Sequence, residues 1–107
     1  KHFGYYQEEN LIGIISLFKN SNELFDTQKQ YQIRGMAVLE NHQKKGIGQN
    51  LVLYTEDSLK AEGAHLIWFN ARESAVNFYR KLGYEIKGKR FEIPNVGPHF
   101  LMFKLQN

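Results

Sequence analysis

Residues 41–50 read NHQKKGIGQN and stand between an apolar run and a segment with helical periodicity. Gly46 and Gly48 allow a backbone to approach a ligand closely, and Lys44 and Lys45 place two positive charges beside them. The first turn of a helix carries unpaired N–H groups and the positive end of the helix dipole, so anions bind there readily. The stretch therefore predicts an anion site at a strand–helix junction, with a charge that suits a pyrophosphate better than a carboxylate.

Two common phosphate-binding motifs do not fit this stretch. A Walker A loop places its lysine after the second glycine, whereas Lys44 and Lys45 precede Gly46. The dinucleotide fingerprint requires a third glycine where Leu51 stands. The alternative to an anion site is a strand–helix turn whose lysines are simply solvated. The surrounding sequence distinguishes these two interpretations.

Apolar periodicity and turn residues predict a mixed α+β (α/β) fold on either side of this turn. Strands are expected at His2–Gln7, Leu11–Phe18, Tyr31–Leu39, His65–Phe69, Tyr84–Ile93 and His99–Leu105, with helices at Gly46–Glu62 and Ser74–Leu82. The central strand–helix–strand unit should be a right-handed crossover with parallel strands, because that handedness is nearly invariant. Short connections make the other strands antiparallel, which gives a mixed, mostly antiparallel sheet.

The same patterns predict which faces are buried. The strand Tyr31–Leu39 is expected to be buried on much of both faces. The first helix should bury Ile47, Leu51, Val52, Tyr54, Leu59 and Ala61. The second helix should bury Ala75, Phe78, Tyr79 and Leu82.

Composition limits the class of protein. The 107 residues, 42% of them hydrophobic, suit one domain over 1–107. A net charge of +3 is mild for a nucleic-acid-binding protein and suits a small polyanion. The chain has no cysteine, its histidines lack metal-ligand spacing, and no apolar run reaches membrane-spanning length. We expect a cytoplasmic protein with no metal, no membrane and no nucleic-acid partner.

Three segments carry a resemblance to one family. Gln43-Lys44-Lys45-Gly46-Ile47-Gly48 fits the pattern Gln/Arg-x-x-Gly-x-Gly/Ala and resembles the acetyl-CoA pyrophosphate loop of the GNAT N-acetyltransferase superfamily. Arg34–Val38 resembles the fourth strand of that family, and Asn77–Tyr84 resembles its Phe-Tyr-x-Lys-x-Gly-Phe/Tyr signature. The resemblance begins at the second strand of the family, and its first strand and first two helices are not recognised here.

The resemblance implies a GNAT-like fold and acetyl-CoA as cosubstrate. It implies that backbone groups of Met36, Ala37 and Val38 hold the pantetheine arm. It implies that the amides of Gln43, Lys44, Lys45, Gly46, Ile47 and Gly48 hold the pyrophosphate. The family often has an asparagine on the cofactor arm where this chain has Arg72, with Asn70 nearby. Either residue can instead cap a helix or be a solvated side chain.

The resemblance also implies that Tyr79 protonates the departing thiolate, whereas by default it is a core aromatic. A glutamate that serves as general base in parts of the family corresponds to Gln32 here. Glu92 and His99, expected to face each other across the last turn, are the candidate bases. A structural role for His99, a solvated strand face for Glu92, and an ordered water remain alternatives.

The sequence thus favours an N-acetyltransferase that moves an acetyl group from acetyl-CoA to a primary amine by direct attack. A non-catalytic GNAT-like module that binds acetyl-CoA or a partner protein is the alternative, and an RNA-binding domain is a weaker one. The acceptor, a small-molecule or peptide amine, is not identified. A homodimer stays open, because an exposed leading strand invites pairing.

Overall fold

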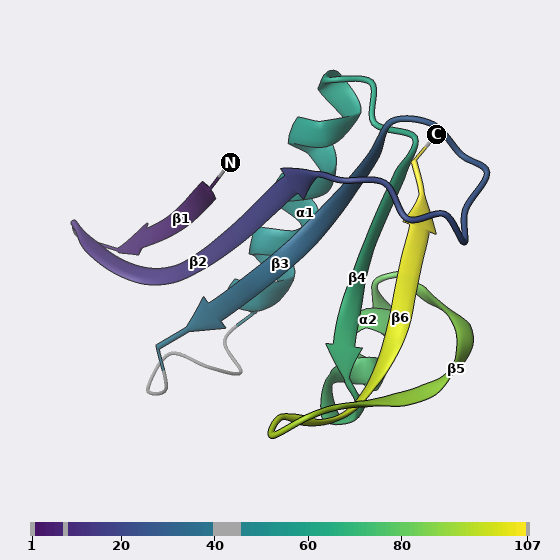
Figure 1. The fold of residues 1–107 in the computed structure, drawn as a ribbon. Helices are drawn as coiled ribbons and strands as arrows, with labels where there is room; N and C mark the ends of the chain where they lie inside the picture. The colour runs from purple at the N-terminus through teal and green to yellow at the C-terminus, as the bar shows by residue number, and fades with distance from the viewer. Residues whose placement is uncertain (1, 8, 40–45, 107) are drawn as a thin grey trace.

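Two helices lie on one face of a six-stranded sheet in the described part of the chain, residues 2–7, 9–39 and 46–106 of a computed structural model (Figure 1). The strands are β1 (His2–Gln7), β2 (Asn10–Lys19), β3 (Gln30–Val38), β4 (Leu66–Arg72), β5 (Glu85–Ile93) and β6 (Gly97–Leu105). The two α-helices are α1 (Ile47–Ala61) and α2 (Val76–Lys81), and a 3₁₀ turn, η2 (Glu73–Ala75), precedes α2. Every expected element is present in the expected order.

The strand order is β1-β2-β3-β4-β6-β5, and the β3–β4 pair is parallel while the other pairs are antiparallel. The α1 connection allows the parallel pair, because parallel strands require a long crossover. The predicted fold class, a mixed and mostly antiparallel sheet around a central strand–helix–strand unit, is therefore confirmed.

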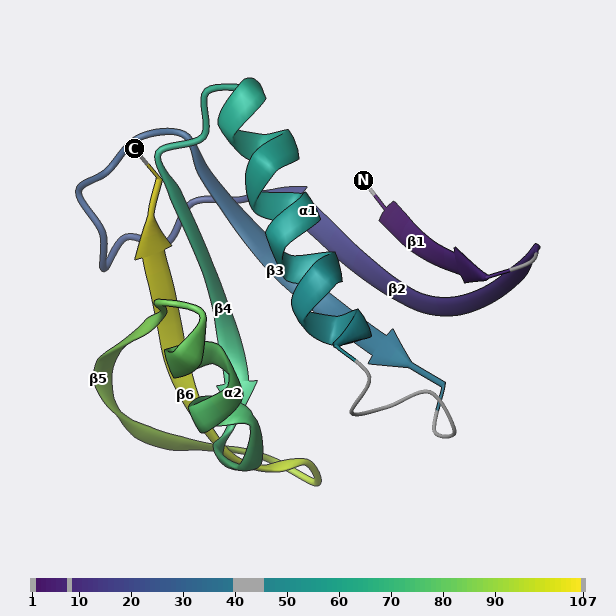
Figure 2. The same cartoon turned by 180° about the vertical axis from the view of Figure 1, so that it is seen from behind.

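Both helices cover the same face of the sheet, α1 over the β1–β3 half and α2 over the half formed by β4, β6 and β5 (Figure 2). The main apolar core lies between the helices and this face. On the opposite face, where the described chain has no helix, a smaller cluster is built from Leu66, Trp68 and Leu101, with Phe25, Phe91 and Phe103 packed against it. We call this the helix-free face.

A β-bulge changes the direction of β3 at Arg34. The pairing of β2 with β3 passes from Ser16↔Gly35 to Leu17↔Ile33, so Arg34 has no partner in the register. Bulges bend a strand and increase its twist. The parallel register with β4 covers only Gln30–Gln32 and ends just before this bulge.

Beyond the bulge the two strands separate, as Figure 1 shows. We call the diverging parts, residues 33–38 of β3 and 69–72 of β4, the fork. The prediction that this strand is buried on both faces is wrong for its second part, since Arg34, Gly35 and Ala37 are exposed. The reason is that β4 no longer lies beside them.

The buried side of α1 differs at three positions from the helical-wheel prediction. Tyr54 is 58% exposed and Ala61 is also exposed, whereas Thr55 is fully buried. The Thr55 hydroxyl donates to the Leu51 carbonyl at 2.8 Å, which satisfies it inside the core. Tyr54 lies at the flank of the helix, where its ring meets Phe3 of β1 edge-on at 5.0 Å between centroids.

The second helical segment also differs in detail. It begins as the η2 turn, and Val76 and Tyr79 are its buried side chains. Phe78, expected on the buried face, is 37% exposed. With only two helical turns, the segment covers a narrow strip of the sheet.

The β5 edge of the sheet is interrupted. Its register with β6 breaks between Lys87 and Phe91, where Gly88 has a φ of 83°. The side chains of Lys89 and Arg90 in this bulge are exposed.

Close packing of α1 on β2 depends on Gly13. A Cβ there would lie 3.1 Å from Leu51 Cδ1 and 3.3 Å from the Ala37 carbonyl oxygen. We expect Gly13→Val to lower the free energy of unfolding by about 1–3 kcal/mol through overpacking. Urea unfolding measures this free energy. Gly35→Ala serves as control, since nothing lies within 4 Å of the position that a Cβ would take at Gly35. Equal stabilities of the two variants would contradict this packing.

Candidate active site

The fork leaves the edges of β3 and β4 facing each other without pairing in their register. On β3, Met36 and Ala37 pair with Ile15 and Ile14 of β2 on their other side. On β4, residues 69–72 pair with β6. The edge of a strand can bind an extended ligand through its main chain, and Met36, Ala37 and Val38, expected to do so, lie on β3 beyond the end of its register with β4.

The backbone at the N-terminus of α1 is accessible to a ligand at Gly46. Gly46 has a left-handed φ of 79°, and nothing lies within 4 Å of the position that its Cβ would take. It has no side chain to cap the helix, and the first turn carries no acidic residue. Gln43, Lys44 and Lys45, predicted to bind the same pyrophosphate, lie outside the described residues.

Gly48 is the point where α1, β3 and α2 meet. A Cβ on Gly48 would lie 3.4 Å from Phe78 Cζ of α2 and 3.6 Å from Met36 Cε of β3. The turn expected to bind the pyrophosphate and the strand expected to bind the pantetheine arm, predicted from separate motifs, therefore adjoin each other. Phe78 also packs edge-on against Tyr79, 5.0 Å between ring centroids, which brings Tyr79 close to the same place.

Tyr79 is a buried aromatic whose hydroxyl has no partner in the described part of the chain. Only 9% of the residue is exposed, and its ring lies 4.4 Å from that of Phe69 on β4. Burial raises the pKa of Tyr79 above its usual value of 10.0, and no hydrogen bond from a described residue opposes this. The phenol is therefore neutral at physiological pH and can donate a proton.

A polar cluster that the sequence did not predict lies behind Tyr79. The Tyr84 hydroxyl donates to Glu56 Oε2 of α1 at 2.9 Å, and Lys104 Nζ of β6 donates to Glu56 Oε1 at 3.1 Å. Burial raises the pKa of Tyr84, and the Glu56 carboxylate raises it further. These residues are 28 and 48 positions apart in the chain, so no local pattern could reveal the cluster.

The two candidate bases do not face each other, contrary to expectation. The register places His99 opposite Phe91 and Glu92 opposite Pro98. Neighbouring residues of a strand point to opposite faces, so His99 and Glu92 lie on different faces of the sheet. The connection between β5 and β6 is shorter than the five-residue turn expected, because β6 already begins at Gly97.

His99 is 4% exposed and its Nδ1 lies 2.8 Å from the Gly97 carbonyl oxygen. A carbonyl oxygen only accepts hydrogen bonds, so Nδ1 carries a proton and Nε2 holds the lone pair of the neutral ring. Glu92 Oε1 lies 3.3 Å from Arg90 Nη1 in an exposed ion pair. Arg90 also donates from Nε to Glu73 Oε2 at 2.7 Å.

Asn70 and Arg72 belong to β4, and Arg72 occupies the N-cap position of η2 without a capping hydrogen bond from its side chain. Their side chains are exposed and alternate with the core residues Phe69 and Ala71, so they lie on the helix-free face beside the fork. Gln32 accepts a hydrogen bond from Asn20 Nδ2 at 2.8 Å.

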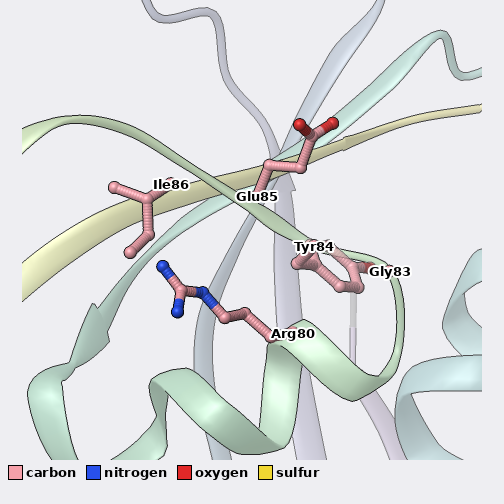
Figure 3. Close-up of a pocket in the computed structure, with 5 residues that line it drawn as sticks. All are labelled: Arg80, Gly83, Tyr84, Glu85 and Ile86. Atoms are coloured by element: carbon pink, nitrogen blue, oxygen red, sulfur yellow. The ribbon is translucent and has the colours of Figure 1, made fainter.

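A shallow pocket of about 470 Å³ lies between α2 and the start of β5 (Figure 3). Its walls are Arg80, Gly83, Tyr84, Glu85 and Ile86. None of the predicted cofactor residues lines it, so it is separate from the fork. In the ranges that the structure describes, no group of three or more histidines and carboxylates is placed to hold a metal ion.

The sequence model of the Acetyltransferase (GNAT) family matches residues 1–84, which include the fork, the α1 turn and Tyr79. The chain belongs to the GNAT acetyltransferase family. The uncharacterized N-acetyltransferase YitI of Bacillus subtilis strain 168 is 35% identical to this GNAT chain over 103 residues, 96% of this chain and 69% of YitI. The putative acetyltransferase BSU40680 of the same strain is 29% identical over 68% of this chain and 49% of its own length.

Solved structures agree with this GNAT fold. An aminoglycoside 6'-N-acetyltransferase complexed with coenzyme A has a TM-score of 0.81 at 19% identity, covering 99% of this chain and 72% of that one. The ribosomal-protein-S18-alanine N-acetyltransferase from Escherichia coli has a TM-score of 0.79 at 17% identity, covering 99% and 68%. No described helix of the present chain has the length and apolar character needed to span a membrane.

The raised pKa of Tyr84 predicts how stability depends on pH. Above pH 10 the unfolded chain loses the tyrosine proton that the folded chain retains, so the free energy of unfolding falls as pH rises. Below pH 10 this contribution is fully present. We expect Tyr84→Phe to make the decline between about pH 10 and 12 shallower. Urea unfolding at a series of pH values measures it, and a decline as steep as in the native chain would contradict the assignment.

Proposed function

We propose that this chain transfers an acetyl group from acetyl-CoA to a primary amine. The observation that carries the proposal is the convergence at Gly48 of the α1 turn, the fork and the helix of Tyr79. Membership of the GNAT family and the coenzyme A present in a structural neighbour support it.

The main chain would bind most of the cosubstrate. The first-turn amides of α1 at Ile47 and Gly48 and the open backbone at Gly46 suit the pyrophosphate. Gln43, Lys44 and Lys45 precede them in the sequence, and the two lysines would add positive charge. The fork suits the pantetheine arm, whose amides can hydrogen-bond to the edge of β3 at Met36, Ala37 and Val38 as another strand would. The ligand would contact the backbone of these β3 residues, while the side chains of Met36 and Val38 pack against the core. The same residues can therefore serve both binding and folding.

Acetyl-CoA supplies the acetyl group as a thioester. The amine nitrogen attacks the carbonyl carbon, a C–N bond forms, and the C–S bond breaks with its electron pair remaining on sulfur. The neutral phenol of Tyr79 gives its proton to that sulfur, and solvent later returns one to the phenolate. General acid help of this kind is typically worth about 10²–10⁴ in rate.

The attacking amine must first lose a proton, since its pKa in water is about 10. We propose His99 as the group that receives it, directly or through water, because the Nε2 lone pair is available and the ring lies on the helix-free face. Tyr79 lies on the helix side. Acid and base would then act from opposite faces of the fork. Glu92 remains a second candidate, weakened by its ion pair with Arg90.

One observation favours a binding module without catalysis. Gln32, at the position of the glutamate base of some GNAT enzymes, is uncharged and holds Asn20 through a hydrogen bond. Calorimetry with acetyl-CoA, followed by thiol release across a panel of amines, separates the two functions. Binding without thiol release above the uncatalysed rate for any amine would favour the module, and the absence of binding would exclude both.

Tyr79→Phe tests the proposed acid. We expect kcat to fall about 10²–10⁴-fold because the proton donor is lost. The affinity for acetyl-CoA should stay within about twofold, since the ring and its packing remain. Thiol release and calorimetry measure the two quantities, with the exposed Tyr54→Phe as control. An unchanged kcat would remove Tyr79 from the mechanism.

Lys44→Gln together with Lys45→Gln tests the pyrophosphate turn. Each lost charge should weaken coenzyme A binding roughly five- to tenfold. A hydrogen bond to a charged group contributes about 1.5 kcal/mol, and about 1.4 kcal/mol corresponds to a tenfold change in Kd. The salt dependence of binding should also decrease. Lys60→Gln removes the same charge from the last turn of α1 and serves as control. Equal affinities of the double variant and the control would place the phosphates elsewhere.

A further inference from the structure

We propose that Glu56, Tyr84 and Lys104 form a clamp that sets the width of the fork and thereby positions Tyr79 for acetyl transfer. The proposal rests on the function proposed above. It assigns no chemical step to the three residues, which act through the placement of other groups.

The fork needs such a device because the sheet is weakly joined at its centre. In the described chain, β3 and β4 pair only at Gln30–Gln32 with Leu66–Trp68. Further bonds between the halves, such as Trp68 Nε1 to the Asn20 carbonyl at 2.9 Å, lie at this closed end. Toward the open end, the backbone pairing of the sheet does not fix the separation of the two halves.

The clamp connects the halves through the helices. Glu56 belongs to α1, which packs on β1, β2 and β3. Tyr84 follows α2, and Lys104 belongs to β6 in the other half. Lys104 Nζ also donates to the Leu82 carbonyl at the C-terminus of α2, at 2.9 Å. One carboxylate on α1 is thus bound to two elements of the other half, on the helix side of the sheet and at the level where Lys104 pairs with Ile67 of β4.

Burial makes these bonds specific. Tyr84 is 2% exposed, and the side chains of Glu56 and Lys104 are 12% and 30% exposed. Replacing such a cluster by apolar side chains often costs a fold little stability, so stability alone does not account for it. Hydrogen bonds from two directions to one carboxylate are satisfied only at one separation of the elements.

The clamp reaches Tyr79 through short contacts. The N–H of Tyr84 donates to the Tyr79 carbonyl at 3.1 Å, and the two rings lie 6.1 Å apart, edge to face. Tyr84 also packs against Phe69, which lies under Tyr79. A displacement of Tyr84 toward or away from α1 therefore moves the proposed acid relative to the α1 turn that binds the phosphates.

The kinetic test is a double-mutant cycle. We expect Tyr84→Phe to lower kcat about 10- to 100-fold by misplacing Tyr79. In a Tyr79→Phe background, the same change should alter kcat less than about twofold, because no acid is left to misplace. Thr55→Val is the matched control, since it removes a buried hydroxyl that donates to the Leu51 carbonyl of the same helix. A purely structural role for Tyr84 would lower kcat equally in both backgrounds and would overturn the proposal.

A distance measurement tests the clamp without any activity. The chain has no cysteine, so substitutions of exposed Asp57 on α1 and Lys81 on α2 by cysteine allow selective spin labelling. We expect double electron–electron resonance to show a broader distance distribution, or one centred at a longer distance, after Tyr84→Phe. The distribution should not change after Thr55→Val. Glu56→Gln, which keeps the side-chain size, should broaden it as well if Tyr84→Phe does not fold.

The outcomes separate this proposal from the proposed function. If Tyr84→Phe changes the distance distribution but neither the native chain nor any variant releases thiol, the clamp is supported and acetyl transfer is excluded. If the native chain transfers acetyl, and Tyr84→Phe and Glu56→Gln change neither kcat nor the distance distribution, the clamp is excluded and acetyl transfer is supported.

Discussion

The loss of backbone pairing between β3 and β4 is the constraint on which the rest of this structure depends. Arg34 adds one residue to β3, the strand bends, and the parallel ladder with β4 stops at Gln32. Unpaired main-chain groups are costly when they are removed from water without a partner. A ligand with its own amide groups can serve as that partner, which a continuous sheet would not permit.

The same separation divides the chemistry between two faces. The helix side holds the α1 turn and Tyr79, a buried phenol that keeps its proton. The helix-free side holds His99, with its lone pair on Nε2, and the exposed side chains of Asn70 and Arg72. Under the proposed function, a thioester in the fork would meet a proton donor on one side and an amine with its base on the other.

Local patterns were enough to predict the fold, because each element has its own signal. Glycine is typical after the last turn of a helix, and Gly63 and Gly83 follow the two helices with positive φ values of 81° and 96°. The bulge at Arg34 had no such signal, since one extra residue changes no composition and only the neighbouring strand reveals it. The prediction that Glu92 faces His99 failed because it depends on the exact register of β5 and β6, in which His99 pairs with Phe91 and Glu92 therefore points to the other face.

The site was predictable only where its parts are contiguous. The glycines of the α1 turn and the tyrosine of α2 each stand in a short motif, so both could be proposed before their proximity was known. The carboxylate of Glu56 stands in no short motif, and only the fold brings Lys104 and Tyr84 to it. Contacts between distant segments leave no trace in a single sequence.

The bulge in β5 has a consequence for the behaviour of the protein in concentrated solution. A regular outer strand presents a row of N–H and C=O groups on which a second molecule can add its own strand. The kink at Gly88 breaks that row, and the exposed charge of Lys89 at the same place disfavours the approach of a neighbouring copy. This border of the sheet is therefore protected against the edge-to-edge stacking that leads to insoluble aggregates.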